Sequence, residues 1–160
     1  MSSKKVWFIT GASRGMGSDI AKAALGAGHA VVATGRDADR VSAALGRSME
    51  LLPAKLDVTS REDAEAAVRA GLEKFGRIDV LFANAGMGLA SPLEAVTEDE
   101  IDRQLDVNFK GVFFAIQRAA PLLAKGGSII VTTSFLNEVG VPGLSILSAT
   151  KAAVRSLVRS

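Results

Sequence analysis

The sequence contains no cysteine and no tyrosine, and its 160 residues include a single histidine. Without cysteine, disulfides and thiolate metal sites are excluded. No partner constellation accompanies the histidine, His29, which we expect in a surface turn. The 19 basic and 17 acidic residues are mixed along the chain and leave a net charge of +2. That balance is too weak to predict a nucleic-acid partner, and we expect no metal site.

Long hydrophobic runs are absent as well. No uncharged apolar stretch approaches the roughly 18 residues that a membrane-spanning helix needs. The N-terminal residues run into a strand without the apolar core of a signal peptide, so we expect a cytoplasmic protein with no membrane partner. Hydrophobic residues make up 48% of the chain, enough for a packed core. The length suits a single nucleotide-binding domain over residues 1–160.

Short β-rich runs alternate with longer segments of helical periodicity. This alternation predicts an α/β fold of the Rossmann type, a doubly wound parallel sheet with helices on both faces. Ligands of such folds bind at the carboxyl ends of the strands. The expected strands are Val6–Thr10, Ala30–Thr34, a strand ending at Asp57, Ile78–Ala83 and Ser128–Thr133.

Two helix starts carry the pattern of a capping box, Thr59 with Glu62 and Thr97 with Glu100. The second opens a long helix, which we expect to end at Gly126–Gly127. A last helix is predicted to begin near Ser148 and to be still running at Ser160. The inward face of the long helix is predicted to carry Ile101, Leu105, Val112, Ile116 and Leu123.

A glycine-rich turn joins the first strand to the first helix. Its sequence is Thr10-Gly11-Ala12-Ser13-Arg14-Gly15-Met16-Gly17. Glycines permit a tight turn in which backbone N–H groups approach a pyrophosphate, and the helix N-terminus adds partial positive charge. A purely structural turn is the alternative. The position between a strand and a helix favours nucleotide binding.

This turn resembles the cofactor turn of the classical short-chain dehydrogenases/reductases, and further matches follow in that family's order over essentially the whole chain. The resemblance implies that Asp57 and Val58 meet the adenine ring and that Asn84-Ala85-Gly86 lies beside the cofactor. The candidate cofactor-binding residues are Gly11, Ser13, Arg14, Gly15, Met16, Gly17, Arg36, Asp57, Val58, Asn84, Ala85, Gly86 and Lys151.

The resemblance also implies an activity, hydride transfer between a nicotinamide and a small carbonyl or alcohol substrate. The family's catalytic asparagine, serine and lysine match Asn108, Ser134 and Lys151. The family's catalytic tyrosine, four residues before the lysine, is Leu147 here. Losing a general acid costs about 10²–10⁴ in rate, so we expect weak or absent turnover. The alternative is a non-catalytic protein that binds or senses NADP(H).

Charge at the end of the second strand distinguishes the two nicotinamide cofactors. An acidic residue there typically binds the ribose 2′-hydroxyl of NAD, but the position is Gly35, followed by Arg36. Arg36 and Arg14 suit a 2′-phosphate, which favours NADP(H) over NAD(H). The competing interpretation leaves Arg36 in solvent and gives the ribose to Asp37. A methyltransferase with a similar sheet would also need an acidic residue at this position to bind a ribose diol. The absence of that residue argues against this alternative.

The chain stops inside the helix that follows the fifth strand, whereas the family continues through further elements. We expect the substrate side of the pocket to be largely missing and the fifth strand to be a bare apolar edge. The long helix and the last helix form the family's dimer face, which implies a possible homo-oligomer. A subunit that completes its sheet on another chain is a further alternative.

Overall fold

A computed structural model describes residues 4–159. Over that range five parallel strands form one sheet in the order β3-β2-β1-β4-β5. The strand order reverses at β1, so the predicted doubly wound architecture is confirmed. The strands are β1 (Val6–Ile9), β2 (Ala30–Gly35), β3 (Leu51–Lys55), β4 (Ile78–Ala83) and β5 (Leu123–Val131).

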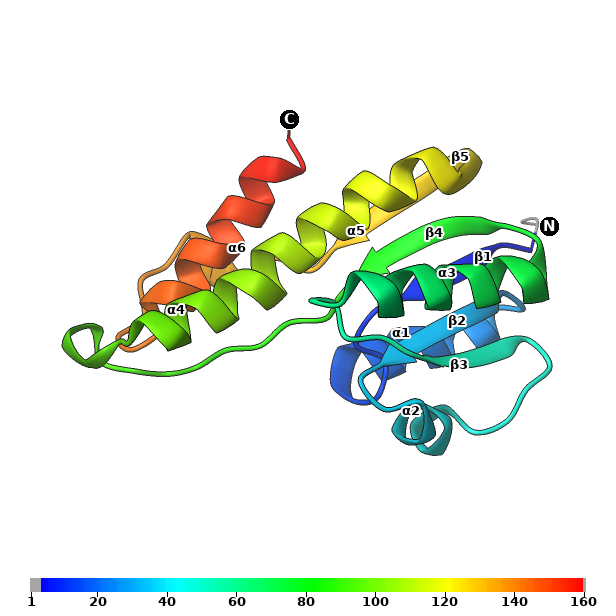
Figure 1. Ribbon diagram of the computed structural model, residues 1–160, viewed down its shortest axis with the longest axis horizontal. Helices are drawn as coiled ribbons and strands as arrows, with labels where there is room; N and C mark the ends of the chain where they lie inside the picture. The colour runs from blue at the N-terminus through cyan, green and yellow to red at the C-terminus, as the bar shows by residue number, and fades with distance from the viewer. Residues whose placement is uncertain (1–3, 160) are drawn as a thin grey trace.

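Helices cover both faces of the sheet because successive strand side chains point to opposite sides. Ile9 packs with Ala21 of α1 (Gly15–Gly26) on one face. Phe8 packs with Ala67 of α3 (Arg61–Phe75) on the other, where α5 (Gly111–Ala119) also lies. Figure 1 shows α3 in front of the sheet and α1 behind it. The central strands therefore read as continuous apolar runs.

Two of the remaining helices gather beyond the carboxyl ends of the strands (Figure 1). There α4 (Glu98–Leu105) contacts α6 (Ser145–Leu157), and a π-helical turn over Asp106–Lys110 joins α4 to α5. The predicted capping box at Thr97 and Glu100 is confirmed. Helix α2 (Ala38–Leu45) and three short 3₁₀ turns complete the described chain, the turns being Leu93–Ala95, Ala120–Leu122 and Phe135–Asn137.

The predicted capping box at Thr59 and Glu62 is wrong. The N-cap of α3 is Ser60, whose hydroxyl accepts a hydrogen bond from the Asp63 N–H at 3.2 Å. Thr59 is drawn away because its N–H and its hydroxyl both donate to Asp57 Oδ1, at 3.0 and 2.7 Å. The helix consequently starts one residue later than the sequence pattern suggested.

The end of the long helix is also wrong in the sequence prediction. The helix stops at Ala119, because Pro121 lacks the N–H that the next turn requires, and Leu123 begins β5 instead of facing inward from the helix. Gly126 and Gly127 lie inside that strand. A Cβ on Gly127 would lie 2.9 Å from the Asp79 carbonyl oxygen, so glycine permits the close approach to β4.

Helix α6 begins three residues before the predicted Ser148 and ends at Leu157, while Ser160 lies outside the described residues. The third strand ends at Lys55, two residues before Asp57. Across residues 4–159, no helix has the length and apolar character that crossing a bilayer requires.

Candidate functional site

The turn between β1 and α1 depends on glycine at three positions. Gly11 and Gly15 have φ values of +70° and +55°, in the left-handed region that side chains disfavour. A Cβ on Gly17 would lie 2.2 Å from the Gly11 carbonyl oxygen and 2.6 Å from Asn84 Nδ2. Only glycine therefore allows the first turn of α1 to pack this closely on the preceding loop.

The N-terminus of α1 has N–H groups that no side chain caps. Its N-cap residue, Arg14, makes no side-chain hydrogen bond to the helix, and its first turn contains no acidic residue. The first N–H groups of a helix have no partner within the helix, and the helix dipole places partial positive charge there. This end of α1 thus provides donors and charge for a phosphate.

Polar side chains fasten the turn to the adjacent strand β4. The Thr10 hydroxyl accepts hydrogen bonds from the N–H groups of Asn84 and Ala85, both at 3.0 Å. In return, Asn84 Nδ2 donates to the carbonyl oxygens of Thr10 and Gly11, at 3.1 and 3.3 Å. Asn84 therefore shapes the turn from the side, which gives the Asn84-Ala85-Gly86 match a structural reason.

A cleft of about 780 Å³ opens along the carboxyl ends of these strands. Its volume falls within the range of about 300–1,000 Å³ typical of small-molecule sites. Part of α4 and the π-helical turn form its far wall. Its lining includes twelve of the residues predicted to bind the cofactor: Gly11, Ser13, Arg14, Gly15, Met16, Gly17, Arg36, Asp57, Val58, Asn84, Ala85 and Gly86.

The turn after β1 and the end of β2 each bring one cation to this cleft. Arg14 and Arg36 are both exposed along it, and within residues 4–159 neither has a carboxylate at ion-pair distance. Asp37, the acidic residue that could instead bind the ribose of NAD, serves as the N-cap of α2. Its Oδ1 accepts hydrogen bonds from the N–H groups of Asp39 and Arg40, at 2.9 and 3.2 Å.

Asp57 lies on the cleft wall after β3, held by its neighbours. Its N–H donates to Asp63 Oδ2 at 3.0 Å, and that hydrogen bond is the main reason that the pKa of Asp63 lies below its ordinary value. One Asp57 carboxylate oxygen is taken up by Thr59. Hydrogen bonds to Thr59 and Asp63 thus hold the loop after β3 in place without a ligand.

Asn108 is fully buried at the centre of the π-helical turn. Its Oδ1 accepts a hydrogen bond from the Met87 N–H at 2.9 Å, and its Nδ2 donates to the Met87 carbonyl at 2.7 Å. The same Nδ2 donates to Thr150 Oγ1 at 3.2 Å. Single π turns often mark functional sites, and this one joins the loop after β4 to α6.

Lys151 is buried on α6, close to the same loop. Its Nζ donates to the Thr132 carbonyl at 2.9 Å, and a Cβ on Gly86 would lie 3.5 Å from that Nζ and 3.3 Å from Asn108 Oδ1. Burial lowers the pKa of the Lys151 ammonium. The structure therefore brings Gly86, Asn108 and Lys151 together.

Leu147 and Ser134, the other two positions of the predicted catalytic set, make different contacts. A Cβ on Gly88 would lie 3.0 Å from Leu147 Cδ2, so the leucine side chain packs against the loop after β4. The Ser134 hydroxyl accepts a hydrogen bond from the Leu136 N–H at 3.2 Å and caps a 3₁₀ turn. Within residues 4–159, neither residue belongs to the lining of the cleft, and the same holds for Asn108 and Lys151.

Sequence reasoning missed several polar residues that build the site. Gln104 is almost fully buried, and its Oε1 accepts a hydrogen bond from the Leu89 N–H at 3.3 Å. Thr132 donates to Asn84 Oδ1 at 3.3 Å. The one available signal was position, since Gln104 falls on the inward face of α4 and Thr132 directly follows β5.

Three comparisons with known proteins bear on this arrangement. A family model described as short chain dehydrogenase matches residues 5–160. Oxidoreductase BOA17 of Botryotinia fuckeliana is 38% identical over 154 residues, which is 94% of this chain and 56% of that protein. The chain spans a little over half to about two thirds of the length of the curated relatives that it matches.

Solved structures agree with the family match. An alcohol dehydrogenase from Thermococcus sibiricus, complexed with 5-hydroxy-NADP, matches with a TM-score of 0.89 and 34% identity over 98% of this chain and 69% of that one. A 3-ketoacyl-(acyl-carrier-protein) reductase from Brucella melitensis, complexed with NADH, matches with a TM-score of 0.87 and 35% identity over 96% of this chain and 66% of that one. The chain belongs to the short-chain dehydrogenase family.

Proposed function

We propose that this chain binds NADP(H) in the cleft at the carboxyl ends of its strands. The residues present fit that group. Gly17 lets the first turn of α1 pack directly on the Gly11 carbonyl, and the uncapped N–H groups at that end of the helix suit the pyrophosphate. Asp57 and Val58 line the region assigned to the adenine ring, and Gly86 lies beside Lys151 at the nicotinamide end. The structural neighbours that were solved with NADP- or NADH-type ligands support this assignment.

The phosphorylated cofactor is favoured by one observation, the pair of exposed arginines along the cleft, one in the turn after β1 and one after β2. Arg14 and Arg36 have no carboxylate partner within residues 4–159, and Asp37 already caps α2. A guanidinium binds phosphate in a bidentate manner, whereas the ribose diol of NAD needs an acceptor at this point. Asp37 is therefore a poor candidate for the ribose.

The reaction class that follows is hydride transfer between the nicotinamide ring and a small carbonyl or alcohol carbon. Bound NADP(H) would supply or accept the hydride, and the protein must move a proton at the substrate oxygen. Leu147, at the position that the resemblance assigns to the family's tyrosine, has no acidic proton to donate. The Lys151 ammonium is directed to the Thr132 carbonyl, so it is not positioned to replace the tyrosine. We infer weak turnover.

The cofactor preference is tested by Arg36→Leu, with NADPH and NADH titrated in parallel. Losing a charged hydrogen bond costs about 1.5–3 kcal/mol, so NADPH affinity should fall roughly tenfold to 100-fold. NADH affinity should stay within about twofold. The control is Arg47→Leu, which removes an exposed arginine beyond α2 that does not line the cleft. Equal weakening of both cofactors by Arg36→Leu would contradict the assignment of the 2′-phosphate.

A second function is a non-catalytic protein that binds or senses NADP(H). The feature that favours it is Leu147, an aliphatic residue at the position that the resemblance assigns to the proton donor, which packs against the loop at Gly88. The two functions separate in steady-state assays with a panel of aldehydes and ketones. A sensing protein binds NADPH and leaves it unoxidised with every substrate, whereas a weak reductase oxidises it with at least one.

A further inference from the structure

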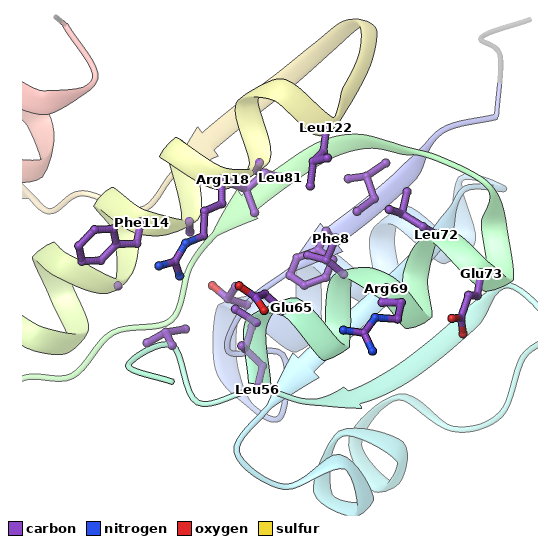
Figure 2. A pocket seen from close by; sticks show the side chains of 18 residues that line it. Phe8, Leu56, Glu65, Arg69, Leu72, Glu73, Leu81, Phe114, Arg118 and Leu122 are labelled. Carbon is purple, nitrogen blue, oxygen red and sulfur yellow. The ribbon is translucent and has the colours of Figure 1, made fainter. Parts of the chain in front are cut away.

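A second concave site lies on the face of the sheet that α3 and α5 share (Figure 2). It is a groove of about 340 Å³, and twelve of its eighteen lining residues are hydrophobic. Its floor is formed by the buried side chains of Phe8, Ile78 and Leu81. The groove lies behind the cofactor cleft and shares only Leu56 and Val58 with it.

Small residues keep this groove open. Ala64 on α3 and Ala115 and Ala119 on α5 line it, at positions where larger side chains would close the gap between the two helices. Two large apolar side chains of its wall remain in contact with solvent, with Phe114 42% exposed and Leu122 47% exposed. Apolar surface of this kind, open yet recessed, is typical of ligand sites.

Cations surround one end of the groove. Arg118 is half-buried, and its guanidinium carbon lies 5.1 Å from the centre of the Phe114 ring. Arg69 is exposed on α3, and both arginines lower the pKa of Glu65, whose main partner is the Arg61 side chain at 2.6 Å. Within residues 4–159 neither Arg69 nor Arg118 forms an ion pair within 4 Å.

Three cations therefore surround a single carboxylate at this end. The other acidic lining residue, Glu73, lies on α3 about two turns after Glu65, toward the opposite end of the groove in Figure 2. The combination is an apolar channel with an uncompensated guanidinium at its mouth. Arg118 is the better anchor of the two because its partial burial and its ring contact hold it in place.

We propose that this groove binds a small amphipathic carboxylate, with its apolar tail over Phe8 and Leu81 and its carboxylate at Arg118. A volume of about 340 Å³ accommodates roughly ten non-hydrogen atoms at about 30 Å³ each. An eight-carbon fatty acid has that size. The buried Thr10 hydroxyl of the lining already accepts hydrogen bonds from Asn84 and Ala85, and the charged side chains lie at the rim, so the headgroup must supply the orientation.

The test titrates octanoate into the full chain at pH 7.5 by calorimetry, with 1-octanol as the uncharged analogue of the same length. Saturable binding is expected, with octanoate at least tenfold tighter than octanol. Arg118→Gln should remove most of that difference, and the matched control Arg47→Gln should leave it unchanged. Ala115→Leu should fill the groove and abolish binding of both compounds.

Folding and cofactor binding are followed in the same samples. Thermal unfolding of Ala115→Leu and NADPH affinity of Arg118→Gln should both match the parent chain, which separates failure of this proposal from failure of the cofactor assignment. Octanol binding as tightly as octanoate would overturn the proposal, as would binding of neither. A dimer that dissociates in Ala115→Leu without any octanoate binding would assign the groove to a second copy and would likewise overturn it.

Discussion

The turn after β1 and the first turns of α6 differ in how fully they meet the needs of the family's chemistry. At the turn, Gly11 and Gly17 permit contacts that no side chain would allow, and Asn84 and Thr10 hold the loop in place. At α6, Lys151 is buried, but Leu147 stands at the position that we assign to the family's tyrosine. In the proposed function, cofactor binding and proton transfer thus depend on separate segments, so one can be lost while the other is kept.

The same two halves differ in packing. Helices cover β1 and β2 on both faces, and Val31, Val32 and Ile9 are fully buried there. On β5, Ile130 is 41% exposed beside Phe82 of β4. Among the described residues β5 is thus an edge strand with a partly exposed apolar side chain.

The largest expected effect comes from restoring the proton donor. Leu147→Tyr should raise NADPH-dependent carbonyl reduction by about 10²–10⁴, the usual contribution of a positioned general acid. Steady-state rates with a panel of aldehydes and ketones measure it. This substitution alters only α6, which lacks the proton donor, and leaves the turn after β1 unchanged. It therefore tests the difference between the two segments directly.

The matched control is Leu147→Phe, which introduces the same ring without the hydroxyl. Its rate should stay at the parent level, and NADPH affinity should be unchanged in both variants. Equal activity in the tyrosine and phenylalanine variants would show that position 147 does not provide the proton. Robust activity of the parent chain would refute the assignment of a deficient site.

The next largest effect is expected from a substitution in the turn after β1. Gly17→Ala forces a Cβ against the Gly11 backbone, where it would lie 2.2 Å from the carbonyl oxygen. Overpacking of this kind costs about 1–3 kcal/mol, and we expect NADPH affinity to fall at least about tenfold as the turn shifts. Fluorescence titration and thermal unfolding measure the two consequences.

Gly26→Ala in the same helix is the control, since a Cβ there meets nothing within 4 Å. Alanine is favoured over glycine in a helix by about 1 kcal/mol, so this variant should be as stable as the parent or more stable. Its NADPH affinity should not change. If Gly17→Ala bound NADPH as well as Gly26→Ala does, the close approach at Gly17 would not matter for the cofactor.

The smallest effect concerns pH. Burial lowers the pKa of Lys151 in the folded chain, so the unfolded chain binds more protons between that lowered pKa and the ordinary lysine value of about 10.4. Below the lowered pKa, the cost of burying the charged ammonium reduces the stability of the folded chain in full. The free energy of unfolding should therefore rise as the pH increases across that window. Urea unfolding at a series of pH values measures the slope.

Lys151→Met removes this contribution and should flatten the rise. Lys110→Met is the contrasting control, because Asp106 raises the pKa of Lys110 and its contribution to stability declines at high pH. An unchanged pH profile in Lys151→Met would show that its ammonium is better solvated than its burial indicates.

Much of the fold could be predicted from sequence because the central strands are buried on both faces. Ile78–Ala83 was placed with its observed limits, and the alternation of strands and helices gave the doubly wound sheet. The capping box at Thr97 was also readable, since all its partners lie within one turn. Local and strongly periodic features were thus accessible.

Features that depend on a choice between competing local signals, or on distant partners, were not accessible. Thr59 and Ser60 are both suitable N-caps, and the choice between them rests on how Thr59 bonds to Asp57. The early end of α5 follows from Pro121, whose effect was outweighed by the apolar periodicity on either side. The roles of Gln104 and Thr132 arise only when separate segments meet, so their positions in the sequence were not enough to indicate the partners.

The most direct measurement of the central claim is a fluorescence titration of the unmodified chain with NADPH, with NADH as the reference. The account predicts saturable one-site binding in the micromolar range, with NADH at least about tenfold weaker because Arg14 and Arg36 would lack a phosphate to bind. Folded protein that binds neither nucleotide would contradict it.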